Sequence, residues 1–128
     1  MTTPHGHFHW NELNTRDIEA ASKFYGAVLG WEFKQVGAEG VAGWLIQKDG
    51  ETLGGAFSLD GPDFEGMPSH WFTYIAVEDV DAAIARVEEA GGTLTRPAFD
   101  VPTAGRIAVI QDPAGAYIAL IQPAAGVA

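Results

Sequence analysis

The sequence predicts an α+β fold built from two βαβββ modules, and three observations support this prediction. The segment 13–21 aligns with the segment 75–83, so the chain repeats itself at an offset of 62 residues. In each copy an extended run leads into an aspartate and then into a stretch whose apolar residues recur at helical spacing. Strand-like runs separated by turn residues follow both stretches. The 128 residues are therefore expected to form a single domain, with module one at 7–59, a linker at 60–69 and module two at 70–123.

Both predicted helices begin at an aspartate and end at glycine. Asp17 and Asp79 stand at the first turn, where a side chain that accepts hydrogen bonds from backbone amides is favoured. Gly30 ends the first helix and Gly91–Gly92 end the second, since glycine readily adopts the left-handed conformation that follows many helices. The apolar faces consist of Ile18, Ala21, Tyr25, Val28 and Leu29 in the first helix and of Val80, Ala83, Ile84, Val87 and Ala90 in the second.

Three strands are predicted after each helix. After the first helix they cover 31–37, 41–48 and 52–59, with Asp49–Gly50 as a hairpin turn. After the second helix the strands cover 93–99, 106–111 and 116–122, with a turn at 112–115. The linker is rich in glycine, proline and acidic residues, so it is expected to be exposed.

The composition excludes several classes of protein. A hydrophobic content of 47% with 19% charged residues excludes a disordered chain, and the absence of cysteine excludes disulfides, thiolate metal sites and a cysteine nucleophile. Seven basic residues against seventeen acidic ones give a net charge of −10, which argues against nucleic acid as a partner. No Gly-x-Gly-x-x-Gly, phosphate-binding loop or Gly-x-Ser-x-Gly motif supports nucleotide binding or serine hydrolysis.

The distribution of the charges adds one open question. Between residues 49 and 85 there are eight acidic residues and no lysine or arginine. This run is either a solvated surface or a region that attracts a cationic ligand. The first ten residues resemble no signal peptide and no apolar stretch reaches the length of a membrane span, so we expect a cytoplasmic protein with no membrane partner.

Two motifs and the paired modules carry a family resemblance. The helix Asp-Ile-Glu-Ala-Ala-Ser-Lys-Phe-Tyr-Gly-Ala-Val-Leu-Gly-Trp at 17–31 and the turn Asp-Pro-Ala-Gly-Ala at 112–116 resemble the vicinal oxygen chelate superfamily, which includes glyoxalase I, bleomycin-resistance proteins and extradiol dioxygenases. The stretch 97–106 resembles a glyoxalase-like branch whose members mostly have no assigned reaction. The resemblance covers nearly the whole chain and implies a curved mixed sheet around a cavity, and a homodimer.

The metal ligands of that superfamily have no counterparts in this sequence. Metal-dependent members place one ligand seven residues before the acid that opens each helix, and another on the fourth strand of each module. The first positions correspond here to Trp10 and Phe72, and the second to Ala119 and a residue between Gly55 and Phe57. Because none of these side chains coordinates a divalent cation, we predict no family metal site and no cofactor.

Three histidines near the N-terminus offer another potential metal site. His5, His7 and His9 alternate, so an extended strand would present them on one face. The competing interpretation is a frayed segment whose histidines are satisfied by solvent or backbone, and we favour it. If Trp10 faces the cavity, His9 faces away from it, so no metal is assigned to these histidines.

Alternation along the strands predicts a ligand site on the cavity face that the resemblance implies. From Trp10 this face carries Glu12 and Asn14, and from Phe72 it carries Tyr74. One of two alternating pairs, Trp44 with Ile46 or Leu45 with Gln47, also points inward. Trp10, Asn14, Trp44, Phe72 and Arg106 are the predicted ligand-binding residues. The aromatic side chains among them either contact a small organic ligand or fill the space that a metal would need.

Glu12 and Tyr74 are the predicted catalytic residues if a reaction takes place. A carboxylate between Trp10 and Tyr74 would be partly desolvated, which would raise its pKa and poise it as a general acid or base. Alternatively, Glu12 anchors a cationic ligand or makes a structural hydrogen bond. Arg106 either pairs with Asp100 to fix a loop or binds an anionic group.

The sequence thus leaves the choice between a binding protein and an enzyme open. The first hypothesis is a metal-independent protein that binds a small, aromatic or cationic organic ligand. The second is a metal-independent lyase or isomerase in which Glu12 moves a proton and Tyr74 donates a hydrogen bond to an oxygen. A metal-dependent glyoxalase or dioxygenase with unexpected ligands ranks third.

Overall fold

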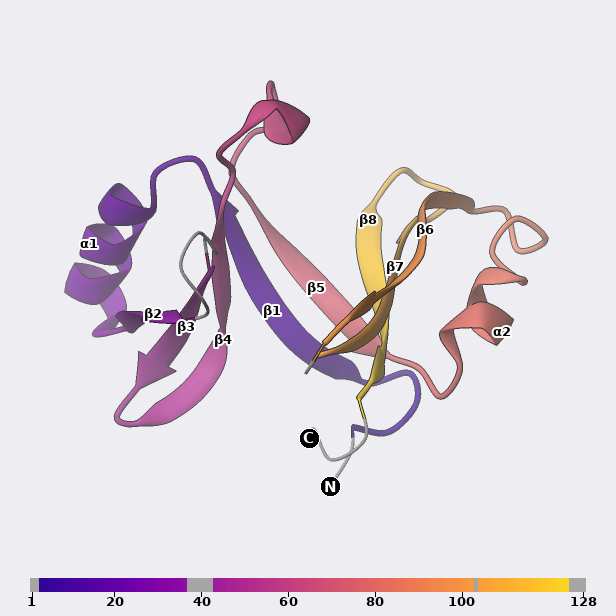
Figure 1. Cartoon of the computed structure of the whole chain (residues 1–128), viewed down its shortest axis with the longest axis horizontal. Helices are drawn as coiled ribbons and strands as arrows, with labels where there is room; N and C mark the ends of the chain where they lie inside the picture. Colours follow the sequence, from indigo (N-terminus) through magenta and orange to yellow (C-terminus); the bar gives the residue numbers. More distant parts are fainter. Residues whose placement is uncertain (1–2, 37–42, 103, 125–128) are drawn as a thin grey trace. The chain divides into compact units, whose positions relative to one another are not determined.

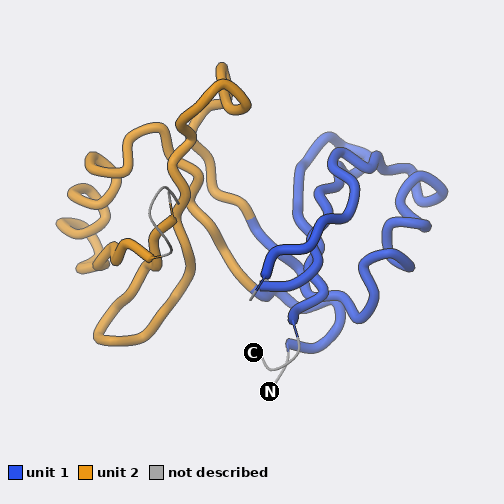
Figure 2. The backbone as a smooth tube through the Cα atoms, in the orientation of Figure 1, with its two compact units in different colours: residues 1–9, 73–128 blue, residues 10–72 orange. Residues whose placement is uncertain are grey.

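The computed structural model describes residues 3–36, 43–102 and 104–124 and divides into two compact units. Unit 2 comprises residues 10–72, and unit 1 comprises residues 1–9 together with 73–128 (Figure 2). The first residues of the chain therefore belong to the same unit as its C-terminal half. None of the helices in the described ranges is long and apolar enough to cross a membrane.

Unit 2 is a βαβββ module. It contains most of β1 (Phe8–Thr15), followed by α1 (Ile18–Leu29), β2 (Glu32–Val36), β3 (Gly43–Lys48), β4 (Glu51–Ser58) and the short 3₁₀ helix η1 (Pro62–Phe64) (Figure 1). The strand order is β2-β3-β4-β1. The hairpins of β2, β3 and β4 are antiparallel, whereas β4 and β1 run parallel.

Unit 1 repeats this order of elements. It contains most of β5 (His70–Ala76), then α2 (Val80–Ile84), β6 (Thr93–Val101), β7 (Gly105–Gln111) and β8 (Tyr117–Pro123). The strand order is β5-β8-β7-β6, again with one parallel pair, β5 with β8. The predicted α+β class with two βαβββ modules is confirmed, because both units show the same order and the same single parallel pairing.

The helices start where the sequence predicts. The carboxylate of Asp17 accepts a hydrogen bond from the amide of Ala20 at 3.0 Å, and that of Asp79 accepts one from Ala82 at 3.1 Å. Gly30 ends α1 in the left-handed conformation at φ 75°. The predicted apolar face of α1 is only partly used, because Val28 is 61% exposed and Leu29 is 45% exposed.

The second helix is shorter than predicted. The apolar spacing continues to Ala90, but α2 ends at Ile84. From there the backbone continues in turns, with bonds from the amide of Arg86 to the carbonyl of Ala83 and from that of Val87 to Ile84. Val87 is still buried while Ala90 is exposed, so the apolar pattern is satisfied by this tighter turn rather than by a continuous helix.

The strand predictions hold to within a few residues. Asp49 and Gly50 both have positive φ, 51° and 80°, as a two-residue hairpin turn between twisted strands requires. Gly37, Val41 and Ala42, which the predicted strands included, lie outside the described residues.

Each helix covers one face of its own sheet. In unit 2, α1 packs on a buried cluster of Leu13, Ile46 and Ala56. In unit 1, α2 supplies Val80 to a cluster that includes Ala108 and Leu120. We call the opposite side of each sheet the helix-free face. Alternation and register assign to it Trp10, Glu12, Leu45, Gly55 and Phe57 in unit 2, and Tyr74, Ile107, Ala119 and Ile121 in unit 1.

Candidate functional site

Trp10 lies on the helix-free face of unit 2, against the backbone of β4. A Cβ atom built at Gly55 would stand 3.1 Å from the indole Nε1 and 3.2 Å from Cζ2 of Trp10. The indole therefore occupies the space above Gly55 that a side chain would fill. Glu12 is the register partner of Gly55, so the carboxylate and the indole belong to the same patch of the sheet.

Two consecutive glycines make this arrangement possible, and they are a signal that the sequence reasoning missed. A Cβ at Gly54 would overlap the backbone carbonyl oxygen of Asn11, while Gly55 makes room for Trp10. Glycine inside a strand often marks such a close approach. The pair Gly54–Gly55 thus predicts that β4 approaches β1 closely, and with it the position of the Trp10 ring.

The register identifies the position in module one that corresponds to Ala119. Glu12 pairs with Gly55 across the parallel strands β1 and β4, and the equivalent residue Tyr74 pairs with Ala119 across β5 and β8. Gly55 is therefore the counterpart of Ala119. By the family resemblance, the ligands of metal-dependent members correspond in this chain to Trp10, Gly55, Phe72 and Ala119.

These four residues do not fit a divalent metal. None of them offers an oxygen, nitrogen or sulfur ligand from its side chain. The Trp10 indole also fills the space above Gly55 in which a metal ligand of β4 would have to stand. Among residues 3–36, 43–102 and 104–124 no three histidine or acidic side chains are grouped closely enough to hold a metal ion.

Asn14 is buried at the end of the same strand and contacts a histidine. Its Nδ2 lies 3.4 Å from Nε2 of His70, while Nδ1 of His70 lies 2.8 Å from the carbonyl oxygen of Pro68. Because that carbonyl can only accept, Nδ1 carries the proton and Nε2 accepts from the Asn14 amide. The Asn14 side chain is thereby held in place at the end of β1.

The assignment of Trp44 to the ligand-binding face is corrected by the structure. Trp44 pairs in register with Ala56 and packs with Ile46 against the buried cluster beneath α1. The alternating pair on the helix-free face is therefore Leu45 with Gln47. Trp44 belongs to the core of unit 2.

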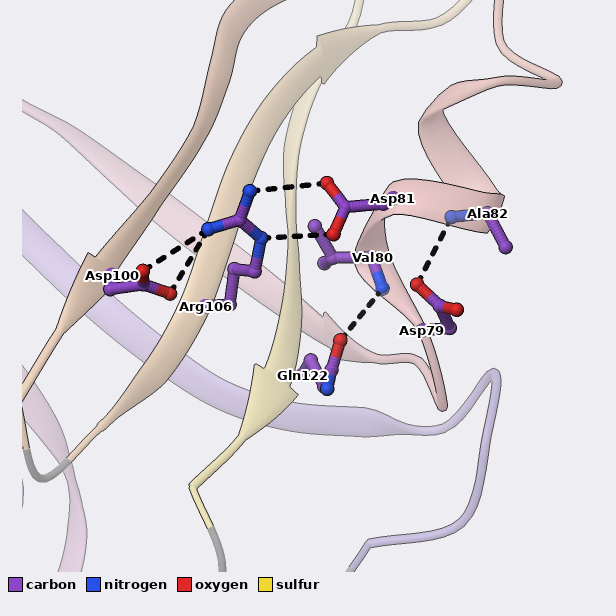
Figure 3. A network of polar contacts seen from close by, with 7 residues as sticks. All are labelled: Asp79, Val80, Asp81, Ala82, Asp100, Arg106 and Gln122. Carbon is purple, nitrogen blue, oxygen red and sulfur yellow. Dashed lines mark hydrogen bonds and ion pairs between the residues drawn. The ribbon is translucent and has the colours of Figure 1, made fainter.

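Arg106 lies on the helix side of its sheet and does not present a free guanidinium. Its Nε and Nη2 donate to the two carboxylate oxygens of Asp81 at 3.1 and 3.2 Å, and its Nη1 donates to Asp100 at 3.1 Å (Figure 3). The hydrogen bonds that Arg106 donates to the carboxylates of Asp81 and Asp100 raise its pKa above its ordinary value. Because both carboxylates neutralise it, the ion-pair alternative holds and the anion-binding role is withdrawn.

The N-terminal histidines bond to unit 1. His5 accepts a hydrogen bond through Nδ1 from the amide of Glu78 at 3.0 Å, and Nδ1 of His9 lies 2.7 Å from the hydroxyl of Thr3. Burial lowers the pKa of His9 below its ordinary value of 6.5. Two of the three histidines, His5 and His9, thus have hydrogen-bonding partners within unit 1.

The remaining predicted residues lie on β1 and β5. Glu12, Phe72 and Tyr74 are half-buried, and the ring of Phe72 meets that of His70 edge to face with 6.1 Å between centroids. Two surface depressions of about 400 and 260 Å³ lie in unit 1, away from Tyr74. Of the predicted residues, Arg106 alone lines one of them, so neither depression corresponds to the predicted site.

Comparison with known sequences identifies a matching family and several relatives of the chain. The family model described as the Glyoxalase/Bleomycin resistance protein/Dioxygenase superfamily matches residues 6–120. A Mycobacterium tuberculosis protein named "Putative glyoxylase CFP32" is 40% identical over 115 residues, which cover 88% of this chain and 44% of that protein. The "Anthracycline biosynthesis protein DnrV" of Streptomyces peucetius is 35% identical over 123 residues, covering 87% of this chain and 45% of that protein. The chain thus spans less than half the length of these curated relatives.

Solved structures share the fold. Methylmalonyl-CoA epimerase from Mycobacterium tuberculosis matches with a TM-score of 0.61 at 21% identity, covering 97% of this chain and 93% of that one. The Mn(II)-bound glyoxalase from Novosphingobium aromaticivorans matches with a TM-score of 0.61 at 17% identity, covering 92% of this chain and 39% of that one. At these identities the similarity concerns the arrangement of the chain and not its chemistry.

Proposed function

Because the chain belongs to the glyoxalase/bleomycin resistance protein/dioxygenase superfamily, we propose that it binds a small organic ligand on the helix-free face without the family's divalent metal. The observation that carries this proposal is the packing of the Trp10 indole on Gly55, at a position where metal-dependent members carry a ligand. An aromatic ring beside the half-buried carboxylate of Glu12 offers stacking and a negative charge in one patch. We take Asn14 and Phe72, which belong to the same unit, as further contacts of the ligand.

We propose a planar aromatic ligand that carries a positive charge. Stacking on Trp10 suits a flat ring system, and Glu12 together with the net charge of −10 suits a cation. One relative is named for anthracycline biosynthesis, and anthracyclines are planar polycyclic compounds that bear an amino sugar. An anthracycline is therefore a sensible first probe.

Tryptophan fluorescence tests this proposal directly. Doxorubicin, a cationic anthracycline, is expected to quench the emission, while the planar anion anthraquinone-2-sulfonate is expected to bind at least tenfold more weakly. Trp10→Phe should remove most of the quenching by doxorubicin. Trp71→Phe is the matched control, because Trp71 packs against Tyr25 and Trp31 on the helix side of unit 2. If neither doxorubicin nor a panel of other cationic aromatic antibiotics changes the fluorescence or the melting temperature, the proposal is wrong.

Metal independence has its own measurement. The protein purified without an affinity tag is expected to contain far less than one equivalent of Zn, Mn, Fe or Ni by elemental analysis, and doxorubicin binding is expected to persist in EDTA. Stoichiometric metal, or binding abolished by EDTA and restored by Mn²⁺, would contradict this part of the proposal.

A proton-transfer role for Glu12 is the second candidate function. The observation that favours it is the register of Glu12 with Gly55, on which the Trp10 ring packs, so that the carboxylate and the ring share one face of unit 2. Glu12→Gln should abolish any turnover found for this protein while leaving the affinity for a neutral ligand within a few fold. Unchanged turnover in this variant would exclude the role.

A homodimer in the cytoplasm is part of the same proposal. The homodimer is what membership of the family implies. Size-exclusion chromatography with light scattering at micromolar concentration should return about twice the mass of one chain. A monomer at that concentration would count against the homodimer without affecting the ligand site.

A further inference from the structure

The linker is held to the end of β1 by one arginine. Nη1 of Arg16 donates to two backbone carbonyls of the linker, that of Phe64 at 2.9 Å and that of Met67 at 2.8 Å. The backbone amide of Arg16 also donates to the hydroxyl of Ser69 at 2.9 Å. These three bonds attach the middle and the end of the segment 60–69 to a single residue. The linker is therefore a fixed part of unit 2, although its residues are exposed.

The start of the linker is attached as well. The amide of Leu59 donates to the carbonyl of Thr15 at 2.8 Å, and the hydroxyl of Ser58 donates to the carboxylate of Asp60 at 2.6 Å. Within the segment, the amide of Phe64 bonds to Gly61 in the turn of η1. Because both ends and the middle are tied down, the backbone position of Phe64 is defined by the fold.

Phe64 points its ring at the helix-free face. Its ring centroid lies 5.5 Å from that of Phe57, and the two planes meet at 75°, a favourable edge-to-face arrangement. Phe57 pairs in register with Asn14, two residues beyond the pair of Glu12 with Gly55, so it shares their face of the sheet. The linker thus adds an aromatic wall at one end of the surface that carries Trp10.

We propose that Phe57 and Phe64 form the end wall of the ligand site and contact the far end of a ligand long enough to reach them, and that Arg16 is the positioning residue that holds this wall. The inference rests on the ligand-binding function proposed above. The guanidinium of Arg16 acts through the two carbonyls it binds and does not touch the ligand. The linker thereby becomes a determinant of specificity rather than a passive connection between the modules.

Amide hydrogen exchange tests, without any ligand, whether the hydrogen bonds of Arg16 hold the linker. Arg16→Ala should accelerate exchange at the amides of Phe64 and Met67 about tenfold or more, because their hydrogen-bonded turns lose the bonds that fix them. Arg16→Lys should restore part of the protection, since an ammonium group also donates to two carbonyls. Arg86→Ala is the control, because Arg86 is an exposed arginine of unit 1. Unchanged exchange in Arg16→Ala would overturn the role of Arg16.

Binding measurements test the wall. Phe64→Ala should weaken doxorubicin binding roughly tenfold and should change the affinity of a shorter two-ring probe, 6-aminoquinoline, by less than threefold. Arg16→Ala should show the same selectivity. Phe24→Ala is the control for non-specific apolar binding, because Phe24 is 60% exposed on α1. Equal losses for both probes, or no loss, would overturn the wall.

The two proposals fail in different ways. If the parent chain binds neither probe while Arg16→Ala still loosens the linker, the ligand-binding function is wrong. The end wall is then wrong as well, and Arg16 has only a structural role. If the parent chain binds doxorubicin and Phe64→Ala binds both probes equally well, the ligand-binding function stands and the end wall is wrong.

Discussion

Single atoms decide how close the strands of unit 2 approach one another. A Cβ at Gly54 would meet a backbone carbonyl, which cannot move without moving β1, whereas a Cβ at Gly55 would meet the ring of Trp10, which can rotate or tilt. A Cβ at Gly26 in α1 would make an ordinary contact of 3.4 Å with the carbonyl of Trp31. A Cβ atom thus meets a severe obstacle at Gly54, a movable one at Gly55 and only an ordinary contact at Gly26.

We predict a corresponding order of stability for alanine substitutions. Gly54→Ala should cost about 3 kcal/mol because the backbone has to shift, and Gly55→Ala about 1 kcal/mol because the indole has to move. Gly26→Ala should instead gain about 0.5 kcal/mol, since alanine favours a helix. Urea unfolding measures the three values, and Gly55→Ala should also shift the tryptophan emission. A Gly55→Ala variant as unstable as Gly54→Ala would mean that the Trp10 ring is rigidly held.

The burial of His9 makes the stability of the folded chain depend on pH. Its pKa in the folded chain lies below 6.5 because desolvation disfavours the imidazolium. Between the two values the unfolded chain binds a proton that the folded chain does not, so stability rises with pH through this window and is lost as the pH falls through it. His9→Gln should therefore lose less stability than the parent chain between pH 7.5 and pH 5. His7→Gln, at an exposed position, is the control. Equal losses for His9→Gln and the parent would contradict the prediction.

At the scale of elements, Arg106 connects three of them. From β7 it binds Asp81 in the first turn of α2 and Asp100 on β6 (Figure 3). The helix has five residues and packs through Val80, Ala83 and Ile84, and Gln122 on β8 also accepts a hydrogen bond from the amide of Val80. The carboxylates are exposed to solvent, so salt should weaken these ion pairs.

We predict that Arg106→Ala removes a salt-dependent part of the stability. The parent chain should lose more stability between 0.05 and 1 M NaCl than the variant does, because screening weakens pairs that the variant lacks. Lys23→Ala, which removes the exposed pair of Lys23 with Glu19, should change the salt dependence less. Arg106→Ala should leave doxorubicin quenching unchanged, and a large loss of binding would restore its role as a ligand contact.

The elements were predictable from local signals, whereas the side of the sheet on which Trp44 lies was not. The repeat, the aspartate caps and the turn at Asp49–Gly50 express themselves in neighbouring residues, and they hold. Alternation groups Trp44 with Ile46 but does not say which side of β3 the helix covers; the register with Ala56 decides it. The clamp by Arg16 leaves no sequence pattern either, since its acceptors are backbone carbonyls that every residue has.

At the scale of the whole molecule, the two compact units do not coincide with the two modules of the sequence. Residues 3–9 belong to unit 1, although the sequence places them next to unit 2. The amide of Gly6 donates to the carbonyl of Ala76 at 2.7 Å, and the amide of Ala76 donates to His7 at 2.9 Å. The internal repeat predicts the two modules. Backbone hydrogen bonds such as these have no residue signature, so the sequence could not predict that the first residues belong to unit 1.

Because the first residues belong to unit 1, we predict that trimming the N-terminus destabilises the C-terminal half of the chain. A chain that starts at Phe8 lacks the acceptors of the amides of Ala76 and Glu78, namely the carbonyl of His7 and the ring of His5. Both amides should exchange at least tenfold faster, because unpaired backbone groups open to solvent. The amide of Leu59 is the internal control, since it bonds to Thr15 within unit 2 and should keep its protection. If instead Leu59 loses protection while Ala76 keeps it, the first residues stabilise unit 2, and the division of the chain into these two units is wrong.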